Sequence, residues 1–278
     1  MDTISKLKRN FVQIWAITRL DVKRTLRYRF TFLMNIINPI ISLIFPLIIF
    51  GFIFSGTLFG EGVNIGVFSA ENYVSLILLG TCGGLYTGFF HIYDAKFRDE
   101  KTYRTLPALI IAPFNRINLL FGIFLTNFIL TLVPFLTIFI LNIVVSSQVP
   151  SIGSMLFIFL IFLAFALTES GFGLVLGILG ISRNNWRTLF LIGYRMVSLF
   201  NCQTFPKEIF PEILHPIINL NPFYHFFELI RIVWVFDTVA YPGNDIHLLV
   251  IIIFVIISPI IGIIVFNKIF SIYGIEGV

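Results

Sequence analysis

The sequence predicts an all-α polytopic membrane protein with six transmembrane helices, and three observations lead to this fold class. Of the 278 residues, 58% are hydrophobic and only 12% are charged, with a mean hydropathy of +0.97. Soluble domains carry about 25% charged residues, so this composition excludes a water-soluble globular domain and a disordered chain. Six apolar runs reach the roughly 20 residues that a helix needs to cross a bilayer. These runs lack the alternation of apolar and polar residues that the shorter strands of a membrane barrel show.

Residues 1–29 precede the first apolar run and are predicted to form a cytoplasmic amphipathic helix in the membrane interface. At 100° per residue, apolar and polar side chains separate onto two sides of this helix. The apolar side carries Phe11, Ile14, Trp15, Thr18, Val22 and Leu26, the polar side carries Arg9, Gln13, Arg19, Lys23, Arg24 and Arg27, and Ile17 and Leu20 are exceptions. Two roles fit this segment, an anchor that sets orientation and a mechanical link from the first span to a cytoplasmic partner.

Residues 30–278 form one predicted transmembrane domain. Its spans are expected over residues 30–55, 73–93, 118–145, 152–181, 188–205 and 247–270. Sixteen of the 19 Lys and Arg residues fall on one side of these spans, and basic residues favour the cytoplasmic side. We therefore expect a multi-pass protein of the cell membrane with both termini in the cytoplasm.

The apolar segment 206–245, before the last span, is predicted to be an extracellular re-entrant segment and not a seventh span. Prolines interrupt any helix before Phe223, at Pro206, Pro211, Pro216 and Pro222. The run that follows, residues 223–236, is about 14 residues long and too short to cross. In this run His225, Glu228 and Arg231 share one helix face, which fits either a polar face at the membrane interface or an extracellular gate.

Two ionisable residues lie within predicted spans, where a charge is costly unless it is paired or hydrated. Glu169 lies about 12 residues from the cytoplasmic end of its span and Arg195 about 8 residues from that of the next, so at 1.5 Å per residue their depths differ by about 6 Å. We predict an ion pair between Glu169 and Arg195. This pair would either join two adjacent helices or form a site for a substrate or a proton.

The polar segment 94–118 between the second and third spans is too short to fold alone, and its sequence carries a motif. The stretch from Glu100 to Pro113 resembles the cytoplasmic signature of type-2 ABC exporter permeases, which export drugs, lipids, nodulation factors and polysaccharides. The matching positions are Glu100, Lys101, Thr105, Leu106, Leu109 and Pro113. Arg104 departs from the pattern, because the family favours a glycine there that permits a tight turn.

This resemblance implies a non-catalytic permease subunit that works with a second permease copy, in a homodimer or a heterodimer, and with a separate ABC ATPase. The ATPase would bind ATP and Mg, and this chain would bind no cofactor and no metal. The residues expected to contact the ATPase are Glu100, Lys101, Arg104, Thr105, Leu106, Leu109, Pro113 and Arg116. Independently of the resemblance, the sequence contains no G-x-x-x-x-G-K-[ST] phosphate loop. The implied function is export of an amphiphile (a drug, a lipid or a lipid-linked glycan) by alternating access.

Two other functions remain open at this point, a membrane-embedded enzyme acting on lipids and a passive channel. Such an enzyme would cluster Asp, His or Glu near a membrane face. Here Asp94, Asp99 and Glu100 alternate with basic residues, and neither His91 nor His215 has a partner at metal spacing. The net charge of +5 is explained by membrane orientation, so no nucleic-acid partner is expected. Cys82 and Cys202 lie in apolar runs and are expected to be packing residues.

Overall fold

The computed structural model describes residues 3–54, 65–104, 115–146, 149–182 and 184–273. Within these ranges every regular element is a helix, apart from one isolated β-bridge between Ile65 and Phe68. The order is α1 (Thr3–Arg27), α2 (Arg29–Ser42), α3 (Ile44–Phe54), α4 (Tyr73–Thr87), η1 (Gly88–His91), α5 (Ile92–Thr102), α7 (Arg116–Val145), α8 (Ile152–Ser182), α9 (Asn184–Leu199), η2 (Lys207–Ile209), η3 (Glu212–Leu214), α10 (His215–Leu220), α11 (Pro222–Phe236) and α12 (Asn244–Tyr273).

Five helices in the described part of the chain are long and apolar enough to cross a membrane. They cover Arg29–Phe54, Tyr73–Thr102, Arg116–Val145, Ile152–Ile181 and Asn244–Ile269, which match five of the predicted spans. The remaining predicted span, residues 188–205, differs. The helix there, α9, runs over Asn184–Leu199 and has 16 residues. It ends early because Asn201 accepts a hydrogen bond from the Gln203 backbone and Cys202 has a positive φ of 52°, which no helix tolerates.

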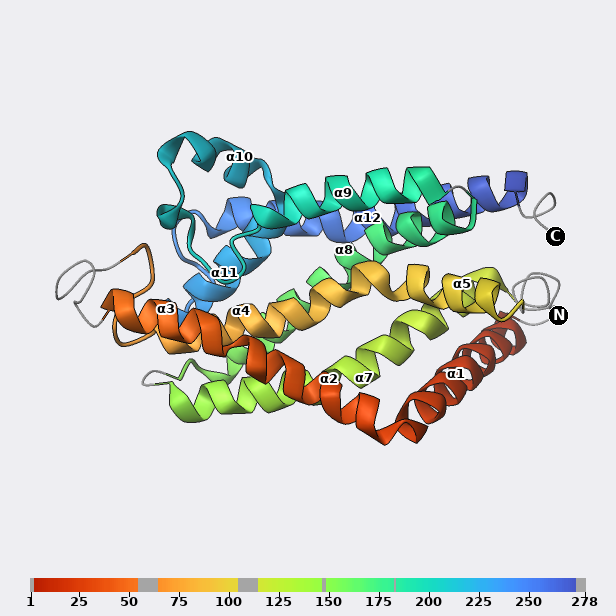
Figure 1. The fold of residues 1–278 in the computed structure, drawn as a ribbon, viewed down its shortest axis with the longest axis horizontal. Coiled ribbons are helices and arrows are strands. Elements are labelled where there is room, and N and C mark those ends of the chain that lie inside the picture. The colour runs from red at the N-terminus through yellow and green to blue at the C-terminus, as the bar shows by residue number, and fades with distance from the viewer. Residues whose placement is uncertain (1–2, 55–64, 105–114, 147–148, 183, 274–278) are drawn as a thin grey trace.

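The long helices lie side by side, and the two ends of the chain lie at the same end of the molecule (Figure 1). Helix α8 occupies the centre and contacts α5, α9, α11 and α12. Its approach to α12 is close, because a side chain at Gly171 would meet Ser258 and one at Gly262 would meet the Gly171 carbonyl. Ser258 also donates a hydrogen bond to the Thr168 carbonyl at 2.6 Å. Small residues thus permit close helix packing at the centre of the fold.

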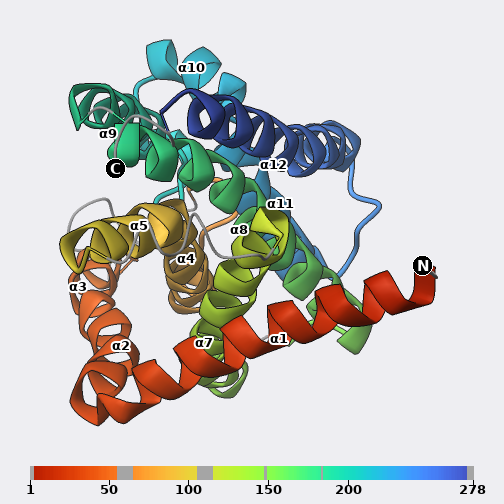
Figure 2. The same ribbon diagram turned by 90° about the vertical axis from the view of Figure 1, so that its right-hand side faces the viewer.

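Helix α1 lies across the bundle near the end that holds both termini, with its main contact on α7 (Figure 2). The contact is partly polar: Asn118 donates hydrogen bonds to Asn10 at 3.0 Å and to Gln13 at 2.7 Å, and Ile17 packs where Gly122 leaves space. Gln13, assigned to the outer polar side, therefore faces the protein together with the exception Ile17. Besides its apolar and polar sides, the helix therefore has a side that packs on α7, which a two-sided pattern does not predict. Of the predicted apolar side, Phe11 and Trp15 remain 68% and 51% exposed.

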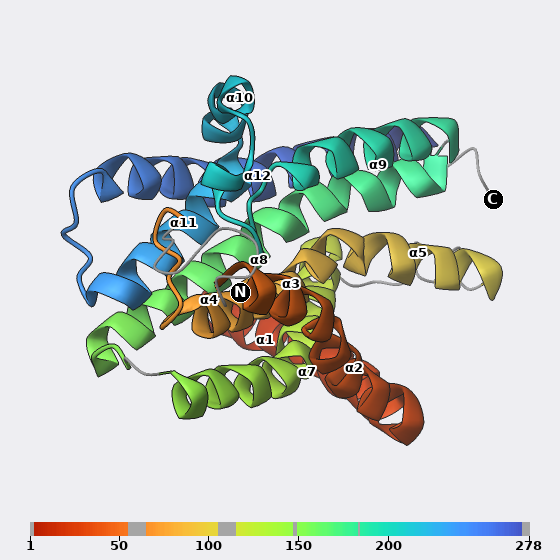
Figure 3. The same ribbon diagram turned by 60° about the vertical axis from the view of Figure 1, so that its left-hand side comes forward.

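The segment between α9 and α12 begins and ends at one end of the bundle, opposite the chain termini (Figures 1 and 3). Within it, α11 starts at Pro222, and the Asn221 side chain accepts a hydrogen bond from the Phe223 backbone. Twelve of the 15 residues of α11 are buried, and the helix contacts α4, α8 and α12. The expectation of a polar face at the membrane interface is thus corrected, because His225, Glu228 and Arg231 are all buried inside the protein.

Candidate functional site

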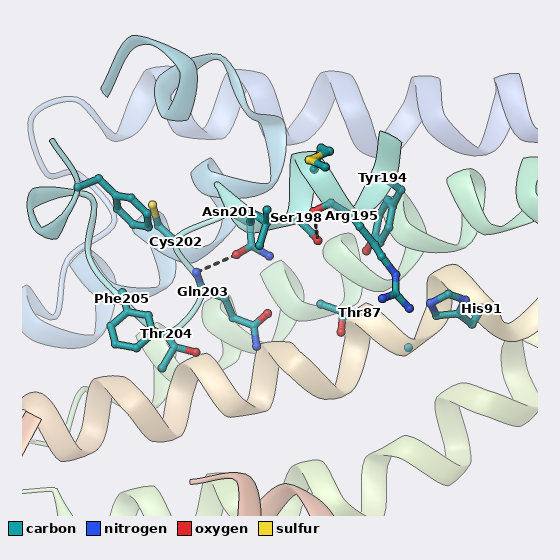
Figure 4. Close-up of a pocket in the computed structure, with 14 residues that line it drawn as sticks. Thr87, His91, Tyr194, Arg195, Ser198, Asn201, Cys202, Gln203, Thr204 and Phe205 are labelled. Atoms are coloured by element: carbon teal, nitrogen blue, oxygen red, sulfur yellow. Dashed lines mark hydrogen bonds between the residues drawn. The ribbon is translucent and has the colours of Figure 1, made fainter. Parts of the chain in front are cut away.

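A cavity of about 700 Å³ lies between the end of α4, η1, α9 and the segment after α9 (Figure 4). Most of the side chains that line it are polar, and an apolar group lies beside them. The polar residues are Thr87, His91, Tyr194, Arg195, Ser198, Asn201, Gln203 and Thr204, and the larger apolar ones are Met196, Leu199, Phe205 and Phe210. A cavity of this size accommodates a drug-sized ligand. It is the main candidate site of the described structure.

Tyr194 fixes the rotation of α9 at the cavity wall. Its ring stacks on Phe90 with centroids 3.4 Å apart, and its hydroxyl donates a hydrogen bond to Glu169 at 2.8 Å. The expected ion pair between Glu169 and Arg195 is replaced by this contact. Consecutive residues of a helix differ by 100° in direction, so with Tyr194 turned toward Glu169, Arg195 projects to another side, into the cavity. The structure thus brings Glu169 to the residue next to Arg195, and the rotation of α9 decides which of the two it contacts.

Gln203 forms part of the cavity wall and is held at three points. Its side chain donates a hydrogen bond to the Gly80 carbonyl at 3.0 Å, its backbone N–H donates to Asn201 at 3.0 Å, and its carbonyl accepts from Arg231 at 3.0 Å. A side chain at Gly80 would meet this carbonyl, so glycine is required for the close approach. The segment after α9 is thereby fixed to α4 and to α11.

Arg231 is the buried cation behind this wall. It is 2% exposed, donates a hydrogen bond to Glu228 at 3.1 Å, and lies with its guanidinium carbon 5.5 Å from the centroid of the Phe68 ring. A carboxylate, a carbonyl and an aromatic face together offset the desolvation of the guanidinium. Arg231 and Glu228 therefore support the cavity wall and do not line the cavity.

His225, on the same helix, contacts a histidine that the sequence analysis did not single out. Its Nε2 lies 2.9 Å from the Asn219 carbonyl, and its Nδ1 lies 2.8 Å from Nδ1 of His247 on α12. A carbonyl only accepts, so Nε2 of His225 carries a proton and donates it to Asn219, and one of the two Nδ1 atoms donates to the other. The two histidines are 22 positions apart and lie on different helices, so no local spacing indicates this contact.

The end of α11 is joined to the start of α8. Asp237 has a left-handed backbone conformation, and its carboxylate accepts hydrogen bonds from the backbone and the hydroxyl of Ser151, each at 2.8 Å. Hydrogen bonds from Ser154 and Ser151 lower the pKa of Asp237 below its usual value. This contact joins α11 to α8 at the end of the bundle opposite the chain termini (Figure 1).

At the opposite end, near the chain termini, a buried carboxylate joins two helices. Asp94 on α5 is 1% exposed and accepts two hydrogen bonds from Arg187 on α9, from Nε at 2.6 Å and from Nη2 at 2.7 Å. Arg98 approaches the same carboxylate at 3.3 Å. A two-point contact of this kind has a fixed geometry as well as a favourable energy. Arg187 lies eight residues before Arg195, about 12 Å along α9.

Helix α5 is also joined to α1. Lys96 approaches the two carboxylate oxygens of Asp21 at 2.9 and 3.0 Å and Glu100 at 3.5 Å. Since η1 and α5 are continuous with α4, one rod connects the cavity residue His91 to the end of α5. The ion pairs of Lys96 and Asp94 tie this rod to its neighbours on two sides.

The sequence motif begins on α5. Glu100 and Lys101 lie in its last turn, and Arg104 follows with a left-handed φ of 58°. The turn for which the family favours glycine is therefore made by an arginine, at a strain of about 1 to 2 kcal/mol. Arg116, at the start of α7, is exposed. Thr105, Leu106, Leu109 and Pro113 lie outside the described residues.

Within the described ranges, no group of three or more His, Cys, Asp and Glu residues is close enough to hold a metal ion. Cys82 and Cys202 are free and buried, and Cys202 also lines the cavity.

Comparison with known protein families gives one clear match. A family model described as ABC-2 type transporter matches residues 12–235. The matched region includes every residue that lines the cavity, and it includes the ion pairs that join α5 to α1 and to α9. A comparison with curated proteins gives no match.

Proposed function

Because the chain belongs to the ABC-2 type transporter family, we propose that it is the transmembrane subunit of an ATP-driven exporter. The family and the apolar helices make it a multi-pass membrane protein and an ABC transporter permease subunit. The finer proposal is that it moves an amphiphile out of the cytoplasm by alternating access. In it, a separate ABC ATPase binds ATP and Mg and drives the change.

In this proposal the chain crosses the membrane six times, with α9 as the fifth crossing. The 16 residues of α9 span about 24 Å, somewhat less than the roughly 30 Å hydrocarbon core. Residues 201–205 continue past the end of the helix along the cavity (Figure 4), which supports a crossing completed without helix. The segment from η2 to α11 then stays on the outer side.

The same proposal places both chain termini in the cytoplasm. The end of the bundle that holds them also carries Asp21, Lys96, Arg98 and Arg187, and its basic residues outnumber those at the other end. α1 then lies in the cytoplasmic interface, where Phe11 and Trp15 would enter the lipid.

We also propose that α5 couples the ATPase to the cavity, and the observation that supports this is the position of the helix. This helix leads directly from His91 at the cavity to the motif at Glu100, and ion pairs join it to α1 and to α9. A force on the segment after Thr102 would therefore move η1, and through Asp94 and Arg187 also α9. Both walls of the cavity would shift together, as alternating access requires.

A second permease copy is proposed to close the open side of the cavity. Exposed apolar side chains recur along α9 every three or four residues, at Trp186, Leu189, Ile192, Met196 and Leu199. Met196 and Leu199 also line the cavity, so a copy packed on this stripe would cover it. The stripe is long and regular enough to be a helix-packing surface.

Co-purification with the cognate ABC ATPase tests the exporter proposal. Replacing Leu106 and Leu109 together by Asp should abolish co-purification and substrate-stimulated ATP hydrolysis, because a carboxylate buried against the ATPase costs several kcal/mol. Leu106→Ala with Leu109→Ala is the matched control and should weaken binding only in part. Membrane insertion should be unchanged in both. Full transport by the double Asp variant, or by the purified chain with no ATPase, would contradict the proposal.

A further inference from the structure

The charge of the cavity points to the chemical class of its ligand. Arg195 and His91 both line it, and its lining residues include no Asp or Glu. In Figure 4 the Arg195 guanidinium extends toward the His91 ring from the opposite wall. Both side chains are exposed to this space. A guanidinium and an imidazole, both able to donate hydrogen bonds, thus face each other across one side of the cavity.

The carboxylates nearest to these groups are already engaged. Glu169 accepts a hydrogen bond from Tyr194, and Asp94 accepts two from Arg187 and approaches Arg98. Among the residues that the structure describes, no carboxylate forms an ion pair with Arg195. The charged groups that act on His91 are Asp94, Arg195, Arg187 and Arg98, of which only Asp94 is negative. The positive charge of this wall is therefore not balanced by the described residues.

The position of Arg195 makes this imbalance significant. It lies 11 residues after Asn184, about 16 Å along α9, and therefore near the middle of the proposed crossing. An arginine at such depth faces an interior cavity and has a partner, and here the partner is missing from the described chain. A guanidinium has five donors in a planar fork that matches the oxygens of phosphates and carboxylates.

The rest of the cavity fits the remainder of an amphiphile. Thr87, Ser198 and Asn201 place hydroxyl and amide groups beside Arg195 and His91. Met196, Leu199 and Phe205 supply apolar surface on the same cavity. Polar groups that fix a head group, next to apolar surface for a chain, are the features of a site for a molecule with both parts.

We propose that this cavity binds the anionic head group of an amphiphile, with Arg195 holding the oxyanion and His91 acting as a second hydrogen-bond donor. The inference rests on the proposed exporter function and adds the substrate class, an amphiphile whose head group is a phosphate or a carboxylate. Its apolar chain lies along Met196, Leu199 and Phe205. Amphiphiles with a cationic head group are disfavoured by the same charges.

Stimulation of ATP hydrolysis by matched amphiphiles tests this inference. The permease is reconstituted with its ATPase in phosphatidylcholine nanodiscs, and four single-chain probes of equal chain length are added: a lysophosphatidylglycerol, a fatty carboxylate, a lysophosphatidylcholine and an alkyltrimethylammonium. We expect the better of the two anionic probes to stimulate hydrolysis at a half-maximal concentration about tenfold below that of the lysophosphatidylcholine. Comparing the lysophosphatidylglycerol with the fatty carboxylate then separates a phosphate from a carboxylate head group.

Three variants assign the effect to Arg195. Arg195→Gln should abolish the preference for anionic head groups, and Arg195→Lys should retain part of it. Lys207→Gln removes one positive charge outside the cavity and should leave the preference unchanged. If Arg195→Gln does not fold, a reduced preference in Arg195→Lys and in His91→Gln supports the inference, and an unchanged preference in both overturns it.

The outcomes separate this inference from the exporter proposal. If the ATPase does not bind or does not hydrolyse ATP in response to any probe, the exporter proposal fails. If hydrolysis responds equally to all head groups, or best to the cationic probe, the exporter proposal stands and the anionic class is wrong. An anionic preference that survives in folded Arg195→Gln overturns the role of Arg195.

Discussion

Arg231 donates a hydrogen bond to the segment after α9, and Arg195 lines the cavity beside the same segment, yet the surroundings of the two arginines differ. Arg231 is 2% exposed and contacts Glu228, the Gln203 carbonyl and the Phe68 ring. Arg195 projects into the cavity, and none of the described carboxylates pairs with it. The comparison teaches that burial in an apolar region does not define a functional arginine. The presence or absence of partners separates a structural cation from one that is available to a ligand.

The largest expected effect comes from replacing each of these two arginines by methionine in a separate variant. Arg231→Met leaves Glu228 buried without its partner and should lower the free energy of unfolding by about 3 to 5 kcal/mol. Arg195→Met removes a charge from a predicted membrane span and should leave the unfolding free energy unchanged or raise it. Thermal unfolding of both variants in the same detergent measures the difference.

A double variant sharpens this prediction. Arg231→Met combined with Glu228→Gln removes both charges, so it should recover part of the loss. Equal destabilisation by Arg231→Met and Arg195→Met would break the comparison, because it would show that Arg195 also has a structural partner.

A smaller effect is expected at Asp94, which forms an ion pair with Arg187 in the same way that Glu228 forms one with Arg231. Asp94→Asn weakens charge-assisted hydrogen bonds and should cost about 1.5 to 3 kcal/mol of stability. It should also reduce substrate-stimulated ATP hydrolysis, since α5 and α9 would no longer move together. Asp99→Asn on the same helix changes an exposed side chain and should shift stability by less than about 0.5 kcal/mol. If the two variants behave alike, Asp94 does not couple the helices.

The smallest effect concerns an arginine whose backbone is strained. Arg104→Gly should relieve the left-handed conformation at φ 58° and stabilise the protein by up to about 1 kcal/mol. Lys101→Gly, three residues earlier in α5, should instead destabilise by about 1 kcal/mol, because glycine is unfavourable within a helix. Thermal unfolding distinguishes the two signs. A loss of stability in Arg104→Gly would mean that the arginine side chain makes a contact that outweighs the strain.

The sequence predicted the helices well because hydropathy and length are one-dimensional properties. Five spans, α1 and the break before α12 all follow from apolar runs and prolines. The end of α9 did not, because Asn201 and the positive φ of Cys202 stop it inside the predicted span. That end depends on one local hydrogen bond, which composition does not encode.

Contacts between helices were predicted less well, because they depend on rotation about each helix axis. Glu169 contacts Tyr194, the residue next to Arg195, and the stacking of Tyr194 on Phe90 turns Arg195 away. The same reason explains Gln13, which faces α7 instead of water. The contacts of Asp94 with Arg187, and of His225 with His247, join residues far apart in sequence and carry no local signal.

The measurement that tests the account most directly is ATP-driven movement of a fluorescent anionic amphiphile in proteoliposomes that contain the permease and its ATPase. The wild-type complex should move the probe only with ATP, and Arg195→Met should move it at least about tenfold more slowly at low probe concentration. Lys207→Gln should match the wild type. Equal transport by Arg195→Met and the wild type, or transport by the permease without ATPase and ATP, would contradict the account.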